Sequence, residues 1–232
     1  MRFKKELLNL FYITYKKINL MKLQKKIYQQ NTLTVARSLL GCILVHKLSE
    51  GLVSGIIVET EAYMGINDKG AHSYRGRHTP RMDPLYKRGG YAYIYQLHGY
   101  NYCLNVVTEK EDQPRAVLIR ALQPLKGLKI MAKLRGVNMS SLKIKNNSDT
   151  PSSAVKNLTN GPSKLCQALA IDSALNGIDL TEDELYITSG NDLRKEIVAT
   201  PRVNIDYAEE DKDKPWRFIL KDNSFLSRVY KE

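Results

Sequence analysis

Two carboxylates stand at the end of an apolar run, where they could act as acid and base. Gly55–Val58 is apolar, and Glu59 and Glu61 follow it with one residue between them. Because side chains alternate along a β-strand, both carboxylates would share one face with Tyr63. Most acid pairs at strand ends are only solvated or ion-paired. A catalytic carboxylate additionally needs a dry surround and a basic partner that keeps it ionised.

An arginine inside another apolar strand could supply that partner. Arg120 lies within the run 117–121, whose other residues are all apolar. A buried guanidinium group must be paired, and a glutamate at a strand end is a natural partner. The sequence therefore predicts an ion pair between Arg120 and one of these two glutamates.

Tyrosines gather beside a basic loop, where they could stack on a base. Tyr63, Tyr91, Tyr93, Tyr95, Tyr100 and Tyr102 adjoin a segment that holds Arg75, Arg77, Arg81, Lys87 and Arg88. Aromatic side chains interleaved with arginine are typical of proteins that hold a base extracted from a duplex. Alternatively, the tyrosines are ordinary half-buried strand residues with no role in binding a base, and this interpretation explains Tyr91 and Tyr102 well.

Other kinds of catalytic chemistry lack their motifs. The four histidines form no H-x-x-x-H pair with a further ligand nearby, so we expect neither a metal nor another cofactor. No G-x-S-x-G, Walker-type loop or G-x-G-x-x-G after a strand is present. The three cysteines form no C-x-x-C, and this odd count favours a reducing compartment.

The charge distribution points toward a polyanionic partner. The net charge of the 232 residues is +12, and residues 113–148 hold basic side chains but no acid. Basic side chains that neutralise phosphates release counterions, so nucleic acid is a natural partner. The charge alone is equally compatible with lysines that only keep the protein soluble. No apolar run approaches the ~20 residues of a membrane span, so we expect no membrane association.

The elements that would position these side chains belong to one mixed α/β domain. We expect a basic extension over 1–30, a single domain over 31–232 and an exposed insertion over 136–158. The patterns predict strands over 42–46, 53–59, 91–95, 102–108, 116–121 and 216–221, and helices over 33–40, 127–135 and 163–171. Thr32 or Thr34 could cap the first of these helices. Gly99 separates two of these strands, which indicates a hairpin with its tip near 98–100.

Several motifs, taken in order, resemble those of the methylpurine (3-methyladenine) DNA glycosylases of the alkyladenine type. The motifs are Ile57–Tyr63, Ala71–Ser73, Arg77–Arg81, Tyr93–Tyr95, Cys103–Asn105, Leu118–Pro124, Asn160–Leu169, Pro201–Val203, Tyr207–Ala208 and Lys214–Phe218. The resemblance runs from about Leu33 to the C-terminus. It implies a curved, mainly antiparallel sheet with surrounding helices and a protruding β-hairpin.

The resemblance also implies an activity, which is the start of base excision repair. Such an enzyme flips a damaged purine out of double-stranded DNA and hydrolyses its N-glycosidic bond, without a lyase step. Its substrates are alkylated or deaminated purines such as 3-methyladenine, 7-methylguanine and hypoxanthine. A monomer in the bacterial cytoplasm, at the nucleoid, or in a eukaryotic nucleus would suit this activity.

The same resemblance assigns roles to individual residues. Glu61 would be the general base and Arg120 would hold the water or the carboxylate. Tyr63, His72 and Tyr95 would sandwich the flipped base, and Asn105 would reject the amino group of guanine. Arg77, Thr79, Arg81 and Lys164 correspond to positions that contact the DNA backbone.

One position departs from the family pattern. The family usually has a tyrosine before the hairpin glycine, as the wedge that fills the hole left by the flipped base. Here His98 precedes Gly99, and Tyr100 follows it. Imidazole is smaller and stacks less, so Tyr100 could take over as the wedge.

Two other functions remain compatible with the sequence. A basic nucleic-acid-binding module that has lost catalysis would explain His98 and the basic extension. A formyltransferase-like or other small-molecule enzyme on a related barrel would not explain the basic loop, and it has no motif of its own here.

Overall fold

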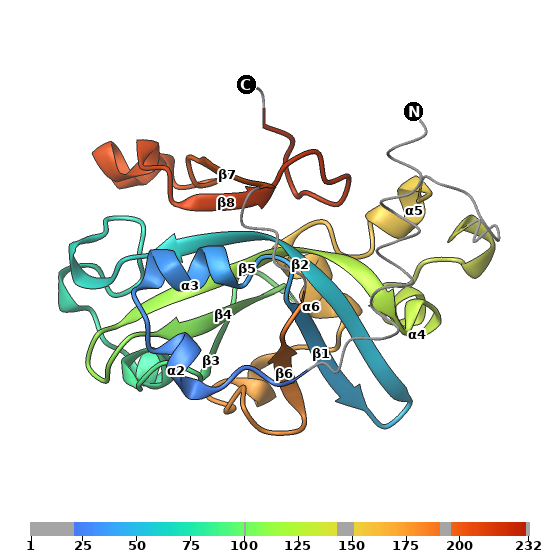
Figure 1. Cartoon of the computed structure of the whole chain (residues 1–232), viewed down its shortest axis with the longest axis horizontal. Helices are drawn as coiled ribbons and strands as arrows, with labels where there is room; N and C mark the ends of the chain where they lie inside the picture. Colours follow the sequence, from blue (N-terminus) through green and yellow to red (C-terminus); the bar gives the residue numbers. More distant parts are fainter. Residues whose placement is uncertain (1–20, 100, 143–150, 191–195, 231–232) are drawn as a thin grey trace.

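A curled antiparallel sheet forms the centre of the molecule (Figure 1). The computed structural model describes residues 21–99, 101–142, 151–190 and 196–230. The strands are β1 (Ile43–Leu48), β2 (Gly51–Tyr63), β3 (Ala92–Gln96), β4 (Tyr102–Thr108), β5 (Arg115–Lys126), β6 (Leu185–Thr188), β7 (Ile197–Thr200) and β8 (Arg217–Leu220). Their order is β3-β4-β5-β2-β1-β6, and β8 pairs with both β2 and β7.

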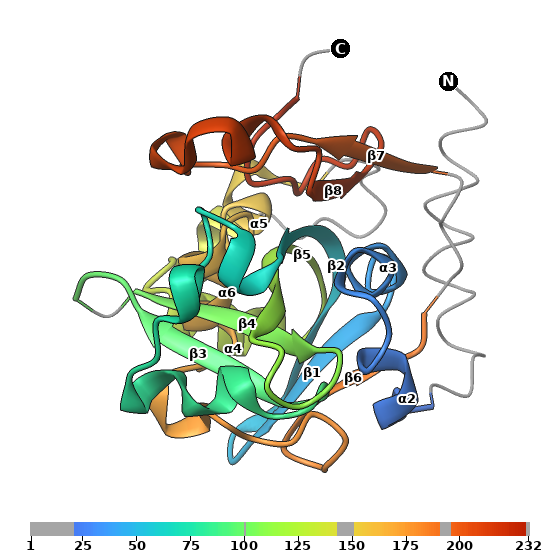
Figure 2. The same ribbon diagram turned by 90° about the vertical axis from the view of Figure 1, so that its left-hand side faces the viewer.

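Short helices surround this sheet. They are the α-helices α2 (Lys25–Tyr28), α3 (Thr32–Ser38), α4 (Leu128–Leu134), α5 (Ser153–Lys156) and α6 (Pro162–Ala168), and the 3₁₀ helices η1 (Gly65–Asn67), η2 (Tyr74–Gly76), η3 (Pro80–Tyr86), η4 (Met139–Leu142), η5 (Ser173–Leu175) and η7 (Asp206–Asp213). The α3 helix packs on β2, and α6 packs on β4 and β5. The turn between β3 and β4 projects beyond the sheet (Figure 2). The predicted mixed α/β fold with a curved antiparallel sheet and a protruding hairpin is confirmed.

The long strand β2 changes its neighbour halfway along. Its first half pairs with β1, whereas Glu59–Glu61 pairs with β8 instead, and β5 follows the other edge throughout. The register between β2 and β5 shifts on both sides of Glu59, so that Val58 is the extra residue on β2 and Arg120 the extra residue on β5. β-Bulges bend strands and redirect side chains, often beside active sites.

The polar segment between β2 and β3 is ordered by its own contacts. It contains η1, η2 and η3, and Asp68 accepts hydrogen bonds from the backbone N–H groups of Met64 and Gly70. Under this segment, Met82, Leu85, Tyr93, Val107 and Ala116 form a small apolar cluster apart from the main core.

The structure adds elements that the sequence patterns did not predict. β6 and β7 lie in segments for which no strand was expected. The helix expected at 33–40 is α3, and Asn31 caps it through its side chain rather than Thr32 or Thr34. Of the expected extension, residues 1–20 lie outside the described residues, whereas Tyr28 is fully buried. Among the described residues, no helix is long and apolar enough to cross a membrane.

The expected insertion at 136–158 begins and ends at the core. Residues 143–150 lie outside the described part of the chain. Leu142 and Leu158, on either side of them, are fully buried in the main core.

Candidate active site

Both acidic side chains at the end of β2 are fully buried. Glu59, Glu61 and Tyr63 share one face of the strand, as their spacing predicts, and the hydroxyl of Tyr63 donates to Glu61 Oε2 at 3.0 Å. The side chain of Arg120 extends from the bulge in β5 and contacts both carboxylates. Its Nε lies 2.9 Å from Glu59 Oε1, and its Nη1 lies 3.1 Å from Glu61 Oε2. The predicted ion pair of Arg120 is therefore present, with two glutamates rather than one.

Glu59 accepts four hydrogen bonds within the described part of the chain. Its Oε1 accepts from Arg120, from Arg217 Nε at 2.8 Å and from Ser227 Oγ at 2.7 Å, and its Oε2 accepts from Ser227 N at 2.6 Å. Burial opposes ionisation, but Arg120, Arg217 and the Ser227 hydrogen bonds hold the pKa of this carboxyl below its usual range. Three of these donors reach Oε1 and one reaches Oε2, and a carboxylate offers about four lone-pair sites in all.

Glu61 keeps one acceptor site open. Within the part of the chain that the structure describes, three donors reach it: Arg120, the Tyr63 hydroxyl and the backbone N–H of Val203, which lies 2.7 Å from Oε1. A carboxylate has about four lone-pair sites. Glu61 is therefore the carboxylate of the pair with fewer hydrogen-bond donors, and it is the one that contacts the hydroxyl of Tyr63.

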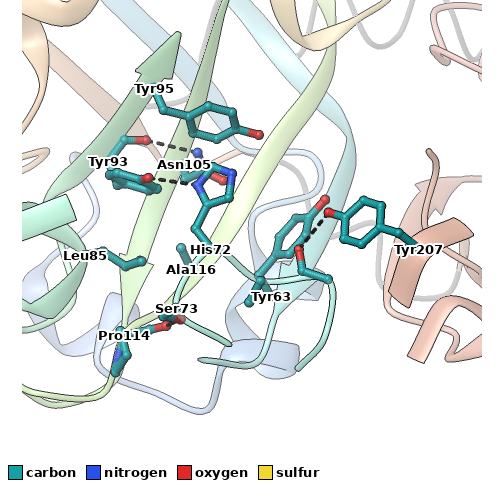
Figure 3. Close-up of a pocket in the computed structure, with 12 residues that line it drawn as sticks. Tyr63, His72, Ser73, Leu85, Tyr93, Tyr95, Asn105, Pro114, Ala116 and Tyr207 are labelled. Carbon is teal, nitrogen blue, oxygen red and sulfur yellow. Dashed lines mark hydrogen bonds between the residues drawn. The ribbon is translucent and has the colours of Figure 1, made fainter. Parts of the chain in front are cut away.

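A pocket lies on the other side of Tyr63 (Figure 3). It encloses about 420 Å³ of empty space including its open mouth. It is lined by Tyr63, Gly70, Ala71, His72, Ser73, Leu85, Tyr93, Tyr95, Asn105, Pro114, Ala116 and Tyr207. Glu61 and Arg120 are not part of this lining, and the Tyr63 hydroxyl connects them to it.

Aromatic rings form two sides of the pocket. His72 and Tyr95 pack edge to face with ring centroids 4.4 Å apart, and Tyr63 lies across from His72 beside Tyr207 (Figure 3). The three residues expected to sandwich a base therefore all line one cavity. His72 and Tyr95 contact each other on one side, so a flat ligand between aromatic faces would lie between His72 and Tyr63.

Hydrogen bonds fix the orientation of His72 and Asn105. His72 Nδ1 lies 2.9 Å from the Tyr93 hydroxyl, and Asn105 Nδ2 donates to the backbone carbonyl of Tyr93 at 3.0 Å. Burial, and then the nearby charges of Arg81 and Arg77, lower the pKa of His72 to about 4. The imidazole is therefore neutral near pH 7, and it presents an uncharged ring to the cavity.

Two of the four residues expected to contact DNA, Arg77 and Arg81, lie near His72 of this pocket. Arg77 and Arg81 are exposed and close enough to His72 to lower its pKa, whereas Thr79 is half-buried. Lys164 is at the start of α6, where its Nζ donates to Asn160 at 3.0 Å. It is not one of the pocket-lining residues.

The hairpin tip carries the departure from the family pattern. His98 is exposed in the β3–β4 turn, and its carbonyl accepts from the side chain of Asn101 at 2.9 Å. Tyr100, the other expected wedge, lies outside the described residues.

The sequence reasoning missed several residues of the site. Arg217 and Ser227 hold Glu59, the N–H of Val203 binds Glu61, and Tyr207 lines the pocket. All of them come from the C-terminal segment, and the motifs at 201–203, 207–208 and 214–218 were the available signal. Among the described residues, no three His, Cys, Asp or Glu side chains gather in a way that could hold a metal ion.

Comparison with known proteins adds an independent observation. A family model described as methylpurine-DNA glycosylase matches residues 26–224. A protein of Clostridium acetobutylicum, by name a 3-methyladenine DNA glycosylase, is 48% identical over 212 residues, which is 91% of this chain and 100% of that protein. Proteins with the same name from Desulfitobacterium hafniense and Clostridium perfringens are 47% and 43% identical, covering 89% and 90% of this chain and 98% and 100% of their own lengths.

Proposed function

This chain belongs to the methylpurine-DNA glycosylase family, and from that membership we propose that it excises alkylated or deaminated purines from double-stranded DNA. It is a hydrolase of the 3-methyladenine DNA glycosylase class. In our proposal the substrates include 3-methyladenine, 7-methylguanine and hypoxanthine, and the nucleotide is flipped out of the duplex before its N-glycosidic bond is hydrolysed.

The unequal coordination of the two glutamates carries this proposal. Among the described residues, Glu59 accepts four hydrogen bonds, whereas Glu61 accepts three. One of the three comes from Tyr63, which forms part of the pocket wall. In our proposal Glu61 binds the attacking water, takes its proton and stabilises the positive charge that develops on the sugar. Arg120 orients Glu61 through its ion pair.

The aromatic walls suit a flipped purine. A base between Tyr63 and His72 would gain stacking energy, and a positively charged alkylated base would gain a further cation–π contribution of about 1–2 kcal/mol. Tyr95 supports His72 from behind. Asn105, held by the Tyr93 carbonyl, would meet the exocyclic amino group of guanine and exclude it.

The surface around the pocket suits a DNA backbone. We assign phosphate contacts to Arg77, Thr79, Arg81 and Lys164, and the role of wedge to the hairpin tip, through His98 or Tyr100. In our proposal the protein acts as a monomer. The named relatives are bacterial, which supports a place beside the chromosome in a bacterial cytoplasm.

Water is the nucleophile in this proposal. The described lining of the pocket contains no lysine, so it offers no amine for a Schiff base with the sugar. We therefore expect base release without strand cleavage.

Single-turnover base release tests the proposal. The substrate is a duplex with one hypoxanthine, and the proteins are the wild type, Glu61→Gln and the control Glu50→Gln, whose carboxylate is exposed and pairs with Lys133. We expect wild type and control to release the base at the same rate and Glu61→Gln to be at least 1,000-fold slower, which is about 4 kcal/mol.

Two results would contradict the proposal. Rapid release by Glu61→Gln would mean that this carboxylate is not the base. If the wild type binds the duplex but releases neither hypoxanthine nor 3-methyladenine, the chain is a binding module rather than the enzyme proposed here.

A further inference from the structure

A buried ion pair lies directly behind the Tyr63 wall. Arg202 Nη1 and Nη2 lie 2.6 and 2.7 Å from the two carboxylate oxygens of Asp68, and neither side chain is exposed to solvent. The guanidinium group lies 4.8 Å from the centre of the Tyr63 ring and 4.9 Å from that of Trp216. It is therefore held between two aromatic rings.

The Tyr63 ring separates this pair from the pocket. Tyr63 lines the cavity, whereas Arg202 does not. A base stacked on the pocket face of Tyr63, about 3.5 Å away, would lie about 8 Å from the guanidinium group. At that distance and an effective dielectric constant of about 20, two unit charges change an equilibrium or a rate roughly 30-fold.

The charge of Arg202 would work against one class of substrate. Purines alkylated at N3 or N7 are cations while they are still attached to the sugar, whereas hypoxanthine is neutral. An uncompensated guanidinium group behind Tyr63 would repel the cations and leave the neutral base almost unaffected. Asp68 cancels that charge through two hydrogen bonds, and the backbone N–H groups of Met64 and Gly70 hold it in place.

The rest of the aromatic wall is also uncharged. His72, across the pocket, is neutral near pH 7 because burial and the Arg81 and Arg77 charges lower its pKa to about 4. Tyr63 itself stays protonated, since burial and the adjacent Glu61 raise its pKa well above the usual range. The surfaces that would contact a base therefore add no positive charge.

We propose that Asp68 is a specificity-determining residue, which neutralises Arg202 behind Tyr63 and thereby lets the pocket take cationic alkylated purines as well as neutral deaminated ones. This inference rests on the proposed function, because it concerns which bases that same site accepts. Asp68 acts through Arg202 and Tyr63 and does not touch the base.

The test compares two substrates in one preparation of each protein. The duplexes are identical except that one carries 7-methylguanine, a cation, and the other carries hypoxanthine. Single-turnover rates are measured with saturating enzyme at pH 8, and the ratio of the two rates is the readout. Since the same folded fraction acts on both duplexes, partial misfolding does not change the ratio.

Three variants give opposite expectations. Asp68→Asn leaves Arg202 uncompensated and lowers the ratio of 7-methylguanine to hypoxanthine release by about 10- to 30-fold. Arg202→Gln removes the positive partner of Asp68, which the two backbone N–H groups still hold in place, and raises the ratio. The double variant Asp68→Asn/Arg202→Gln has no charge there and returns the ratio to within about threefold of the wild type.

The outcomes separate this inference from the proposed function. If the wild type releases neither base, the proposed function fails. If it releases both and the single variants change the two rates equally, the ion pair only supports the fold and this inference is wrong. If Asp68→Asn does not fold, the inference is supported by a raised ratio in Arg202→Gln together with a wild-type ratio in the double variant. An unchanged ratio in Arg202→Gln overturns the inference.

Discussion

Glu59 should contribute more to stability than any exposed carboxylate, and Glu59→Gln tests this. The side chain has no solvent exposure and accepts hydrogen bonds from Arg120, Arg217 and Ser227. Glutamine keeps the size but loses the charge and part of the accepting capacity. Arg120 would still be paired with Glu61, whereas Arg217 would keep only neutral acceptors, Thr200 Oγ1 and the Arg228 carbonyl.

The expected loss follows from the charge that remains buried. Breaking a buried ion pair by removing one partner costs about 3–5 kcal/mol. Because Glu61 still compensates Arg120, the lower end applies, and we expect about 3 kcal/mol at pH 7. For a chain of this length each kcal/mol lowers Tm by about 2–4 °C, so Tm should fall by about 6–12 °C.

The pH dependence gives a second, independent expectation. The folded-state pKa of Glu59 lies below its ordinary value of 4.5. A group with a depressed pKa contributes stability above its unfolded pKa and loses it as the pH falls through the folded pKa. The difference between wild type and Glu59→Gln should therefore be constant above about pH 5 and shrink below pH 4.5.

Urea unfolding followed by circular dichroism at pH 7 and pH 4 measures both expectations. Glu50→Gln is the matched control, because Glu50 pairs with Lys133 at the surface, and its unfolding free energy should stay within about 0.5 kcal/mol of the wild type. The reasoning is refuted if Glu59→Gln unfolds at the same urea concentration as the control at pH 7. A loss that stays equally large at pH 4 would refute the charge argument alone.

Three further predictions concern the pocket and its surround. Arg81→Ala should weaken binding to damaged and undamaged duplexes alike and reduce the slope of log K against log salt by about 1, as measured by fluorescence anisotropy. The wild type should lose stability as the pH falls from 6.5 toward the folded pKa of His72 of about 4, because the unfolded state binds the proton at a higher pH than the folded state. Urea unfolding at pH 7 and pH 5 should show a smaller drop in unfolding free energy for His72→Gln than for the wild type. Asn105→Ala should raise guanine release relative to hypoxanthine release by about tenfold, and an unchanged ratio in single-turnover assays would exclude Asn105 as the discriminating side chain.

The sequence predicted those parts of the site in which chemistry is encoded locally. Glu59, Glu61 and Tyr63 share a face because of strand alternation, and the apolar run around Arg120 required a partner for its charge. These inferences needed only the period of a strand and the cost of burying a charge.

Residues that reach the site through tertiary contacts were not predictable in this way. Val203 and Ser227 bind the glutamates of β2 from 142 and 168 residues away. Their types, valine and serine, carry no chemical signal, and one of the bonds to Glu61 uses a backbone N–H. The predicted cap of α3 was wrong for a similar reason, because the Thr32 hydroxyl bonds to Thr108 and Glu109 and Asn31 caps the helix instead.

The change of neighbour along β2 explains why two glutamates on one face differ. Where β8 replaces β1, the C-terminal segment covers the strand, and Arg217 and Ser227 fill the acceptors of Glu59. Ser227 lies three residues beyond the segment 26–224 that the family model matches, so part of this arrangement is not contained in the family match. Without those donors Glu59 would keep only one of its four hydrogen bonds, the one from Arg120. Covering Glu59 therefore leaves Glu61 as the carboxylate able to act on a water molecule beside the pocket.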